Sequence, residues 1–182
     1  MCTTVEALGL VTPFAASPEE EKSRELILAL LEQTPAPFSR HQFHPGHITC
    51  TAVVLHPDRR GVLLVYHRRL RRWLLPGGHV EEDDAMLAEV ARREAMEETE
   101  VQIADCASAR LVGMDVHGIP GHKGKGEPFH LHHDLIFGME AESEVVAKTE
   151  EAPDVVWCGT REFEKYALPG SILRAVGRAL QR

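Results

Sequence analysis

Apolar positions repeat with two different periods along the chain, and the period changes from one segment to the next. β-Branched and apolar residues crowd residues 47–56 and 62–66, and the Pro-Asp turn and glycine between them predict a β-hairpin. Further strand-like segments lie at residues 109–116, 130–139 and 154–157. Helical periodicity predicts helices over residues 17–33, 84–98 and 169–181. Strands and helices mixed at this spacing favour an α/β or α+β layered domain with a mixed sheet.

The first of these helices has a well-defined start and end in the sequence. Ser17 is placed as the N-cap, and Glu20 three positions later completes a capping box. Pro35 and a second proline two residues on end the helix, whose expected role is packing or dimer contact. We therefore expect residues 1–45 to form an N-terminal helical extension and residues 46–182 to form the main domain. A chain of 182 residues, 43% of them hydrophobic, is long enough to bury one good core.

Composition narrows the classes of function. The formal net charge of −8 argues against a general nucleic-acid binder, because such proteins neutralise phosphates with Lys and Arg. The four cysteines are widely scattered without a CxxC pair, which indicates reduced thiols and a cytoplasmic protein. Residues 1–16 contain no Lys or Arg, so a secretory signal is not expected, and no apolar run reaches the roughly 20 residues of a membrane span.

The helix over residues 84–98 places acidic residues on its inward face. At roughly 100° per residue, Glu97 and Glu98 fall within about 60° of Glu94, on the stripe that the first half of the helix gives to apolar residues. Like charges at these spacings repel by roughly 0.2–0.5 kcal/mol per pair, and a hydrated acidic helix end would point outward instead. Such a conflict on an inward face indicates a functional site. Clustered carboxylates select hard cations, Mg²⁺ or Mn²⁺ here, which suits phosphoryl transfer.

Two sequence blocks at a constrained separation carry the most specific signal. They are residues 77–81, GGHVE, and residues 93–99, REAMEET. Together they resemble the Nudix box of the Nudix hydrolases, and the likeness extends over roughly residues 48–163. The resemblance implies an α/β/α sandwich, here with an added N-terminal helix. It also implies metal-dependent pyrophosphohydrolysis of a nucleoside diphosphate linked to another group, a small-molecule substrate. Homodimer formation is an expectation at the level of the family only.

The resemblance also implies roles for individual residues. Glu94, Glu97 and Glu98 match the metal-binding glutamates of the family, and Gly77 matches a glycine whose carbonyl can join the coordination. Arg93 matches the arginine that orients the glutamates.

Members of the family differ in the residue that deprotonates the attacking water. Some use the glutamate that matches Glu94, and others use one on a late loop, where Glu150 or Glu151 would stand here. We favour Glu94 and keep Glu151 as a second catalytic candidate.

The chain departs from the family pattern at two places in the box. The spacer is one residue longer than the commonest form, which puts Asp84 or Ala85 where the first box glutamate usually stands. Glu100 replaces the glycine that usually follows Glu-Glu-Thr, so the helix exit is expected to differ, since glycine there permits a left-handed cap. Residues 37–41, 45–47, 115–120 and 130–134 resemble a bacterial subgroup of the family, which indicates lineage and no chemistry.

Basic and imidazole side chains near the box are candidates for substrate binding. The candidates are Arg68, Arg72, His79, His130 and His132. The basic segment over residues 67–72 would steer an anionic substrate, although a solvated hairpin exit explains it equally well.

Histidines also recur along the expected strand over residues 130–139. There His130, His132 and Asp134 share one face and His133 lies on the other, a row that suits phosphate or a second metal, with His117 approaching from a neighbouring strand. Histidines beside a wet cleft need no ligand, however, so both readings stay open.

A histidine series and two aromatic residues give weaker evidence of a binding site. His41, His44 and His47 have a loose metal-like spacing, but a Pro-Gly pair interrupts it. Trp157 and Phe129 either stack on a nucleobase or pack in the core, the commoner fate of aromatic residues.

Two rival functions use the same scaffold. A regulatory module would bind a nucleotide-like ligand without cutting it, and such proteins usually lose the box glutamates, which are all present here. A diphosphate isomerase would need a cysteine and a glutamate that act on carbon, and neither Cys50 nor Cys158 has a recognisable setting for that.

Overall fold

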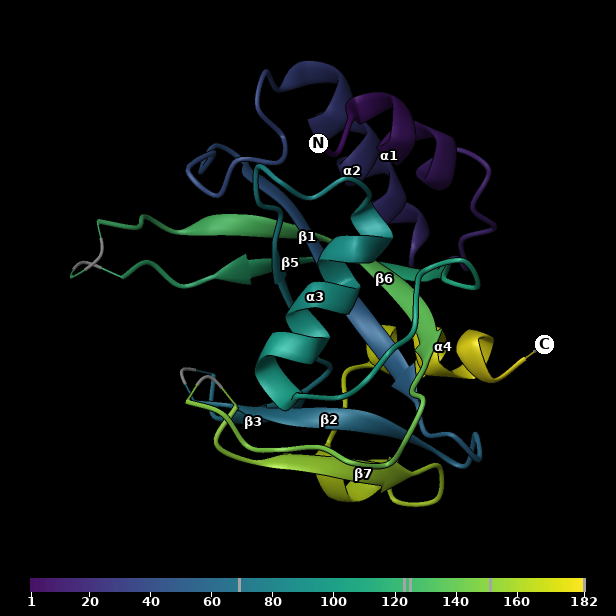
Figure 1. The fold of residues 1–182 in the computed structure, drawn as a ribbon. Coiled ribbons are helices and arrows are strands. Elements are labelled where there is room, and N and C mark those ends of the chain that lie inside the picture. The colour runs from purple at the N-terminus through teal and green to yellow at the C-terminus, as the bar shows by residue number, and fades with distance from the viewer. Residues whose placement is uncertain (69, 123, 125, 151, 182) are drawn as a thin grey trace.

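A mixed sheet lies between helices on both of its faces in the computed structural model, which describes residues 1–68, 70–122, 124, 126–150 and 152–181 (Figure 1). The strands are β1 (Gly46–Leu55), β2 (Gly61–His67), β3 (Arg72–Leu74), β4 (Gly77–His79), β5 (Arg110–Ile119), β6 (His130–Glu140) and β7 (Val155–Gly159). The helices are α1 (Thr4–Val11), α2 (Glu21–Gln33), α3 (Leu87–Thr99) and α4 (Gly170–Leu180), with the 3-10 turn η2 (Phe163–Tyr166). The expected α/β/α sandwich is confirmed.

Strand β1 pairs with different neighbours along its length, within a single sheet. Its central path runs β3-β2-β1-β6-β5, with β1 and β6 parallel and the other pairs antiparallel. Strand β1 meets β2 at Leu55, whereas its Thr49–Thr51 stretch pairs with β4 instead. Strands β1 and β2 therefore separate toward the start of β1, and the cavity described below is lined from both sides of this separation.

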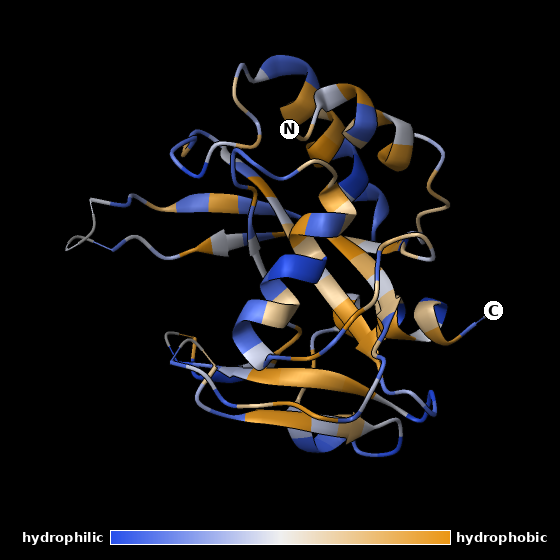
Figure 2. Ribbon diagram, in the orientation of Figure 1, coloured by the Kyte–Doolittle hydropathy of each residue, from blue (hydrophilic) through white to orange (hydrophobic). Residues whose placement is uncertain are grey.

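Alternation along the strands builds two apolar cores. In β1, Ile48 and Cys50 belong to the core under α1, α2 and α3, while Val53 and Leu55 belong to the core under α4. Successive side chains of a strand point to opposite faces, so a strand covered on both sides is apolar almost throughout. Figure 2 shows this most clearly along β2, which is drawn in hydrophobic colour over most of its length.

The N-terminal segment contains two helices where the sequence predicted one. The unpredicted α1 is capped by the Thr3 hydroxyl, which accepts a hydrogen bond from the Glu6 backbone N–H at 3.1 Å. Helix α2 ends at Gln33 as predicted but begins at Glu21. The capping box is half formed, because the Ser17 N–H donates to the Glu20 carboxylate at 3.0 Å while the Ser17 hydroxyl has no hydrogen-bond partner in the part of the chain that the structure describes. The division between residues 1–45 and 46–182 stays a prediction.

Helix α3 differs from its prediction at both ends. It begins at Leu87, whose N–H donates to the Glu6 carboxylate of α1 at 2.7 Å, so the first turn is held from another helix. At the other end Glu100 adopts the left-handed conformation, with φ 55°, and its N–H donates to the Met96 carbonyl. The prediction of a different helix exit was wrong, since Glu100 takes the conformation that a glycine would take.

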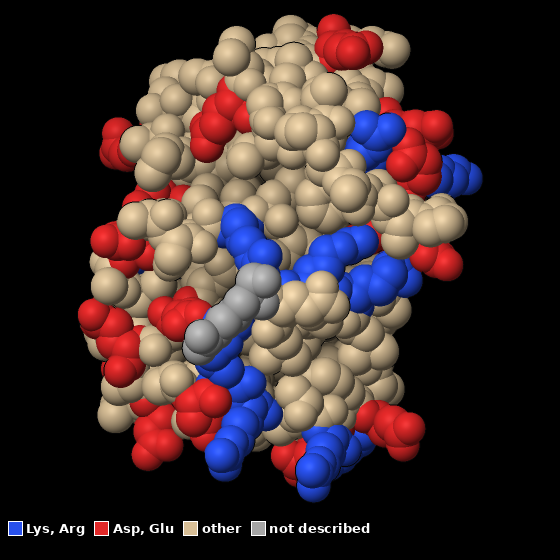
Figure 3. Space-filling view, turned by 90° about the vertical axis from the view of Figure 1, so that its right-hand side faces the viewer, with Lys and Arg blue, Asp and Glu red and all other residues tan. Residues whose placement is uncertain are grey.

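Basic side chains gather on the face of the molecule where α4 ends (Figure 3). The end of α4 is closed by arginines from elsewhere in the chain: Arg59 donates to the Ala179 carbonyl at 3.1 Å and Arg110 to the Arg178 carbonyl at 2.6 Å. Cations at this end satisfy carbonyls that have no partner within the helix, which gives these arginines a structural role.

Among the helices of the described residues, none combines the length and the apolar composition that a membrane crossing requires.

Candidate active site

Two glycines of β4 allow the backbone to lie directly against the glutamates of α3. The Gly77 N–H donates to Oε2 of Glu98 at 3.1 Å. A Cβ added to Gly78 would stand 2.5 Å from the carboxylate atoms of Glu94, a distance that real Cβ atoms do not adopt. A Cβ added to Gly77 would stand 2.6 Å from the Cys50 carbonyl oxygen, so glycine there lets β4 lie close to β1. Gly78 leaves room for the Glu94 carboxylate.

Arg93 holds the acidic groups of the site in place. Its Nε and Nη2 donate to the two carboxylate oxygens of Asp84 at 3.1 and 3.0 Å, and Nη2 also donates to the His79 carbonyl at 2.9 Å. Its Nη1 donates to Glu94 at 3.2 Å and to Glu97 at 3.0 Å. Burial raises the pKa of Asp84, but the hydrogen bonds from Arg93 and from the Glu81 N–H outweigh it and leave this pKa below its usual value.

Of the two residues that stand where the first box glutamate usually does, Asp84 is the one that the structure places against Arg93. Its carboxylate is buried against Arg93, whereas the side chain of Ala85 is exposed. Arg93 contacts three carboxylates, those of Asp84, Glu94 and Glu97.

The three glutamates of the box do not all face the same space. The side chain of Glu94 is 14% exposed and lines the cavity together with Glu98. The side chain of Glu97 is 55% exposed, does not line that cavity, and is held at its edge by Arg93. The inward direction expected from the helical period is thus observed for two of the three carboxylates.

The cavity beside these carboxylates has a volume of about 490 Å³ and contains groups from six of the seven strands. Glu94, Glu98 and Gly77 lie on one wall. Carboxylate and carbonyl oxygens with room for water are the donor set that Mg²⁺ and Mn²⁺ prefer, so these residues fit a hard divalent cation.

Further acidic and polar groups line the cavity from β1, β5 and β6. The Thr49 hydroxyl donates to Asp134 at 2.9 Å, and Nδ1 of His117 lies 3.0 Å from a carboxylate oxygen of Asp115. Burial raises the pKa of Asp134. Burial lowers the pKa of His117, but the hydrogen bond to Asp115 and the charge of Asp134 outweigh it and raise this pKa above its ordinary value.

Asp115 and Thr49 were missed as site residues. Their signal was a polar residue within an apolar strand, and only the pairing of β5 with β6, Asp115 opposite Asp134, brings the two carboxylates together.

The expected substrate-binding residues are divided between two adjoining cavities. Arg72, His79 and His132 line the main cavity. His130 lines a neighbouring cavity of about 160 Å³, which His79 and His132 also border. Arg68 is exposed and lines neither cavity.

The segment just before the two candidate general bases, Glu150 and Glu151, is hydrogen-bonded to the end of α3. The Thr149 hydroxyl donates to the Glu98 carbonyl at 2.9 Å, and the Ala147 N–H donates to the Thr99 carbonyl at 2.8 Å. Glu150 is exposed, and Glu151 lies outside the described residues.

Neither aromatic candidate for base stacking lines a cavity of the site. The Trp157 Nε1–H donates to the Glu144 carbonyl at 2.9 Å, and the ring packs against the first core. Phe129 is 62% exposed. The two cysteines named for an isomerase, Cys50 and Cys158, are buried and do not line the main cavity.

Comparison with known proteins agrees with this arrangement. The family model of the NUDIX domain matches residues 46–175. Solved structures of similar fold include the MutT protein from Bacillus halodurans, with a TM-score of 0.54 and 20% identity over 74% of this chain and 82% of that one. Another is the NUDIX domain of Shewanella oneidensis NrtR, complexed with ADP ribose, with a TM-score of 0.55 and 21% identity over 83% of this chain and 94% of that one. No functionally curated protein matches the sequence.

The chain belongs to the Nudix family, because the family model covers more than two thirds of it and includes both blocks of the box. It is accordingly a Nudix hydrolase, an enzyme that acts on phosphoric anhydrides.

Proposed function

We propose that this hydrolase is a metal-dependent pyrophosphohydrolase for a nucleoside diphosphate linked to another group. In the proposed reaction, water attacks one phosphorus of the diphosphate bridge, the bond from that phosphorus to the bridging oxygen breaks, and two phosphorylated fragments leave. The observation that carries this proposal is the placement of Glu94, Glu98 and Gly77 on one wall of a cavity of about 490 Å³.

The proposal assigns the cation, Mg²⁺ or Mn²⁺, to Glu94, Glu98 and the Gly77 carbonyl, with Glu97 joining from the edge. When bound, such a cation neutralises charge that develops on the phosphate oxygens and polarises water. Arg93 keeps the glutamates in position through its hydrogen bonds to Glu94 and Glu97. Arg72 carries a guanidinium into the same cavity, where it would contact an anionic substrate.

The proposal also assigns the general base to Glu94. Its carboxylate lies against Gly78 at the cavity wall, where a water close to a cation would be within reach. Glu151, which the family resemblance offered as a second candidate, is the alternative; the nearby residues Ala147 and Thr149 are hydrogen-bonded to the end of α3.

The test combines a substrate screen with one variant and a matched control. Nucleoside triphosphates, nucleotide-sugars, dinucleotides, coenzyme A and capped RNA are incubated with Mg²⁺ or Mn²⁺ in ¹⁸O-labelled water, and label in each phosphorylated product locates the attacked phosphorus. On the best substrate, Glu98→Gln is expected to lower kcat by about 100-fold or more, which corresponds to about 2.7 kcal/mol of lost transition-state stabilisation. Glu89→Gln, on the same helix but outside the cavity lining, should leave kcat unchanged.

Two outcomes would overturn the proposal. Near-normal turnover by Glu98→Gln with Mg²⁺ supplied would remove the assigned role of that carboxylate. Tight binding of a nucleotide-sugar with no phosphorylated product under either cation would favour a sensing module that binds without cutting. A cytoplasmic location and homodimer formation stay predictions of the sequence.

A further inference from the structure

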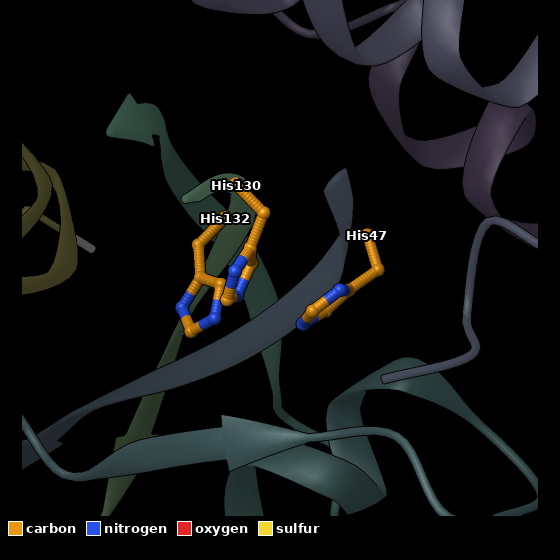
Figure 4. Close-up of side chains that lie close together, drawn as sticks. All are labelled: His47, His130 and His132. Atoms are coloured by element: carbon orange, nitrogen blue, oxygen red, sulfur yellow. The ribbon is translucent and has the colours of Figure 1, made fainter. Parts of the chain in front are cut away.

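Five histidine side chains meet beside the carboxylates of the active site. The ring of His132 lies 5.0 to 5.7 Å, between centroids, from the rings of His47, His79, His117 and His130. Three of the five, which we name the histidine trio, are His47, His130 and His132. Their ligand nitrogens lie within 4.8 Å of one another, and the trio is the one such metal-compatible group among the described residues. Figure 4 shows the three side chains reaching toward one another from β1 and β6.

Strand pairing creates this cluster from positions far apart in the sequence. Strands β1 and β6 are parallel neighbours, and His47 stands opposite His132 in their register. His130 precedes His132 by two residues, so both side chains leave β6 on the same face. The trio is therefore fixed by the central sheet and does not depend on a loop.

Hydrogen bonds decide which ring nitrogen carries the proton in two members of the trio. Nδ1 of His47 lies 3.0 Å from the Gln42 carbonyl, and Nδ1 of His130 lies 2.9 Å from the Pro128 carbonyl. A carbonyl oxygen can only accept, so in both neutral rings Nδ1 carries the proton and Nε2 carries a lone pair. Orientation of a ligating imidazole by a backbone carbonyl is the usual arrangement around metal-bound histidines.

One of these lone pairs is buried without any partner. His47 is 0% exposed, and its Nε2 has no hydrogen-bond partner among the described residues. Buried polar atoms are almost always paired because leaving one unpaired costs roughly 1–3 kcal/mol. An electron-pair acceptor between the rings would supply the missing partner.

The electrostatics favour a cation over an anion at this position. Burial and then the neighbouring imidazoles lower the pKa of His132 to about 2, and burial also lowers the pKa of His47. Both shifts favour the neutral form of these two rings, and neutral imidazole is the form that binds metals. Nε2 of His47 carries a lone pair and no proton when Nδ1 donates to Gln42, so it can bind a cation but cannot donate to a phosphate oxygen, which argues against the anion-binding alternative.

We propose that His47, His130 and His132 form a second cation site, selective for a borderline transition metal such as Zn²⁺ and separate from the carboxylates of α3. Imidazole ligands favour Zn²⁺, Co²⁺, Ni²⁺ and Cu²⁺, whereas Mg²⁺ and Mn²⁺ prefer oxygen. Nitrogens around a tetrahedral Zn²⁺ stand about 3.3 Å apart, given a Zn–N distance of about 2.05 Å, so the rings must close by up to about 1.5 Å on binding.

Two members of the trio border a cavity that would admit a fourth ligand. His130 and His132 line the cavity of about 160 Å³, which gives water or a substrate oxygen access to the ion. His79 borders the same cavity, and its ring lies 5.1 Å from that of His47 and 5.2 Å from that of His132. Three protein nitrogens with one open position would resemble a catalytic zinc site more than a structural one.

Titration of the chelator-treated protein with Co²⁺ tests the site without any activity assay. Co²⁺ takes the place of Zn²⁺ and has visible absorption that becomes intense in tetrahedral or five-coordinate nitrogen sites. One equivalent is expected to produce this absorption, and excess Mg²⁺ should not remove it. His132→Gln and His130→Gln should each weaken Co²⁺ binding by about 100-fold or more, as measured by calorimetry.

Matched variants separate this site from its neighbours. His41→Gln, at a histidine outside the trio, and Glu98→Gln, at the carboxylate site, should both retain the absorption and the affinity. Circular dichroism verifies that every variant is folded. The proposal is overturned if wild-type protein binds no Co²⁺, if both trio variants bind it with wild-type affinity, or if only Glu98→Gln loses it. Because hydrolysis is not measured, failure here leaves the proposed pyrophosphohydrolysis untouched.

Discussion

At the scale of single residues, one guanidinium organises the acidic groups of the active site. Arg93 contacts Asp84, Glu94 and Glu97 and the carbonyl of His79, so strand β4, the loop before α3 and the helix itself meet at one side chain. The planar fork of arginine makes such shared contacts, whereas lysine offers a single charged point. Arg93 is therefore a positioning residue whose geometry matters as much as its charge.

Replacing Arg93 by lysine should impair catalysis while preserving the charge. The substitution Arg93→Lys retains one ion pair but cannot contact all three carboxylates, so kcat/KM should fall by roughly 10- to 100-fold and half-saturation should require more Mg²⁺. Steady-state kinetics across a Mg²⁺ titration measures both effects.

The neighbouring arginine is the control. Arg92 donates to the carbonyls of Ile103 and Ala104, away from the cavity, so Arg92→Lys should hydrolyse substrate like wild type. Equal kinetics for the two lysine variants would show that the fork of Arg93 is not needed.

At the scale of elements, helix α3 supplies the carboxylates and ends in a strained residue. Glu100 has φ 55°, in the left-handed region that costs an L-residue with a side chain roughly 1–2 kcal/mol. The N–H of Glu100 nevertheless closes the helix on the Met96 carbonyl, so the exit has the same shape as a glycine cap. The strain lies two residues after Glu98.

Glycine at this position should stabilise the protein. Glu100→Gly is expected to raise the free energy of unfolding by about 1 kcal/mol, because glycine adopts this conformation without the steric cost. Urea unfolding followed by circular dichroism measures the change. Glu89→Gly, in the first turn of the same helix, where Glu89 also pairs with Arg92, should instead lower stability by about 1 kcal/mol. A loss of stability in both variants would mean that the left-handed cap carries no relievable strain.

At the scale of the whole molecule, a buried ion pair joins the N-terminal segment to the last helix. Glu20 is 1% exposed, and its Oε1 accepts from Nη1 of Arg178 in α4 at 2.7 Å. The same Nη1 donates to the Val112 carbonyl of β5 at 3.0 Å. The start of α2, an edge strand of the sheet and α4 are thus connected through one guanidinium.

The ion pair between Glu20 and Arg178 should make the free energy of unfolding depend on pH. Burial raises the pKa of Glu20, but the hydrogen bond from Arg178 and the Ser17 N–H outweigh it and lower this pKa to about 2. The ordinary value, which applies in the unfolded chain, is 4.5. The pair therefore contributes its full stability above about pH 4.5 and loses it as the pH falls toward about 2.

The substitution Glu20→Gln tests this dependence. It should lower the free energy of unfolding at pH 7 by roughly 3–5 kcal/mol and flatten the decline of stability between about pH 4.5 and 2. Denaturant unfolding across this pH range measures both. Glu25→Gln, at an exposed position on α2, should reproduce the wild-type curve, and an unchanged curve for Glu20→Gln would refute the role of the pair.

The sequence by itself determined the longer strands and three of the four helices, together with half of the active site. Alternation in β1 and β6 and the helical period around Glu94 are local spacings, and local spacing decides which face of an element a side chain takes. The glycines before α3 and the inward Glu94 and Glu98 were therefore predictable, as was the sandwich that surrounds them. The family resemblance added the roles that spacing alone does not assign.

Only the tertiary structure decided which side chains from distant segments meet. The parallel register of β1 with β6 places His47 against His132, and the antiparallel register of β5 with β6 places Asp115 against Asp134. Register depends on how complete strands pack against both cores, and a shift of one residue would turn every side chain to the other face. The helical period also did not predict that Glu97 lies outside the cavity lining, where its carboxylate contacts Arg93, the same arginine that contacts Asp84.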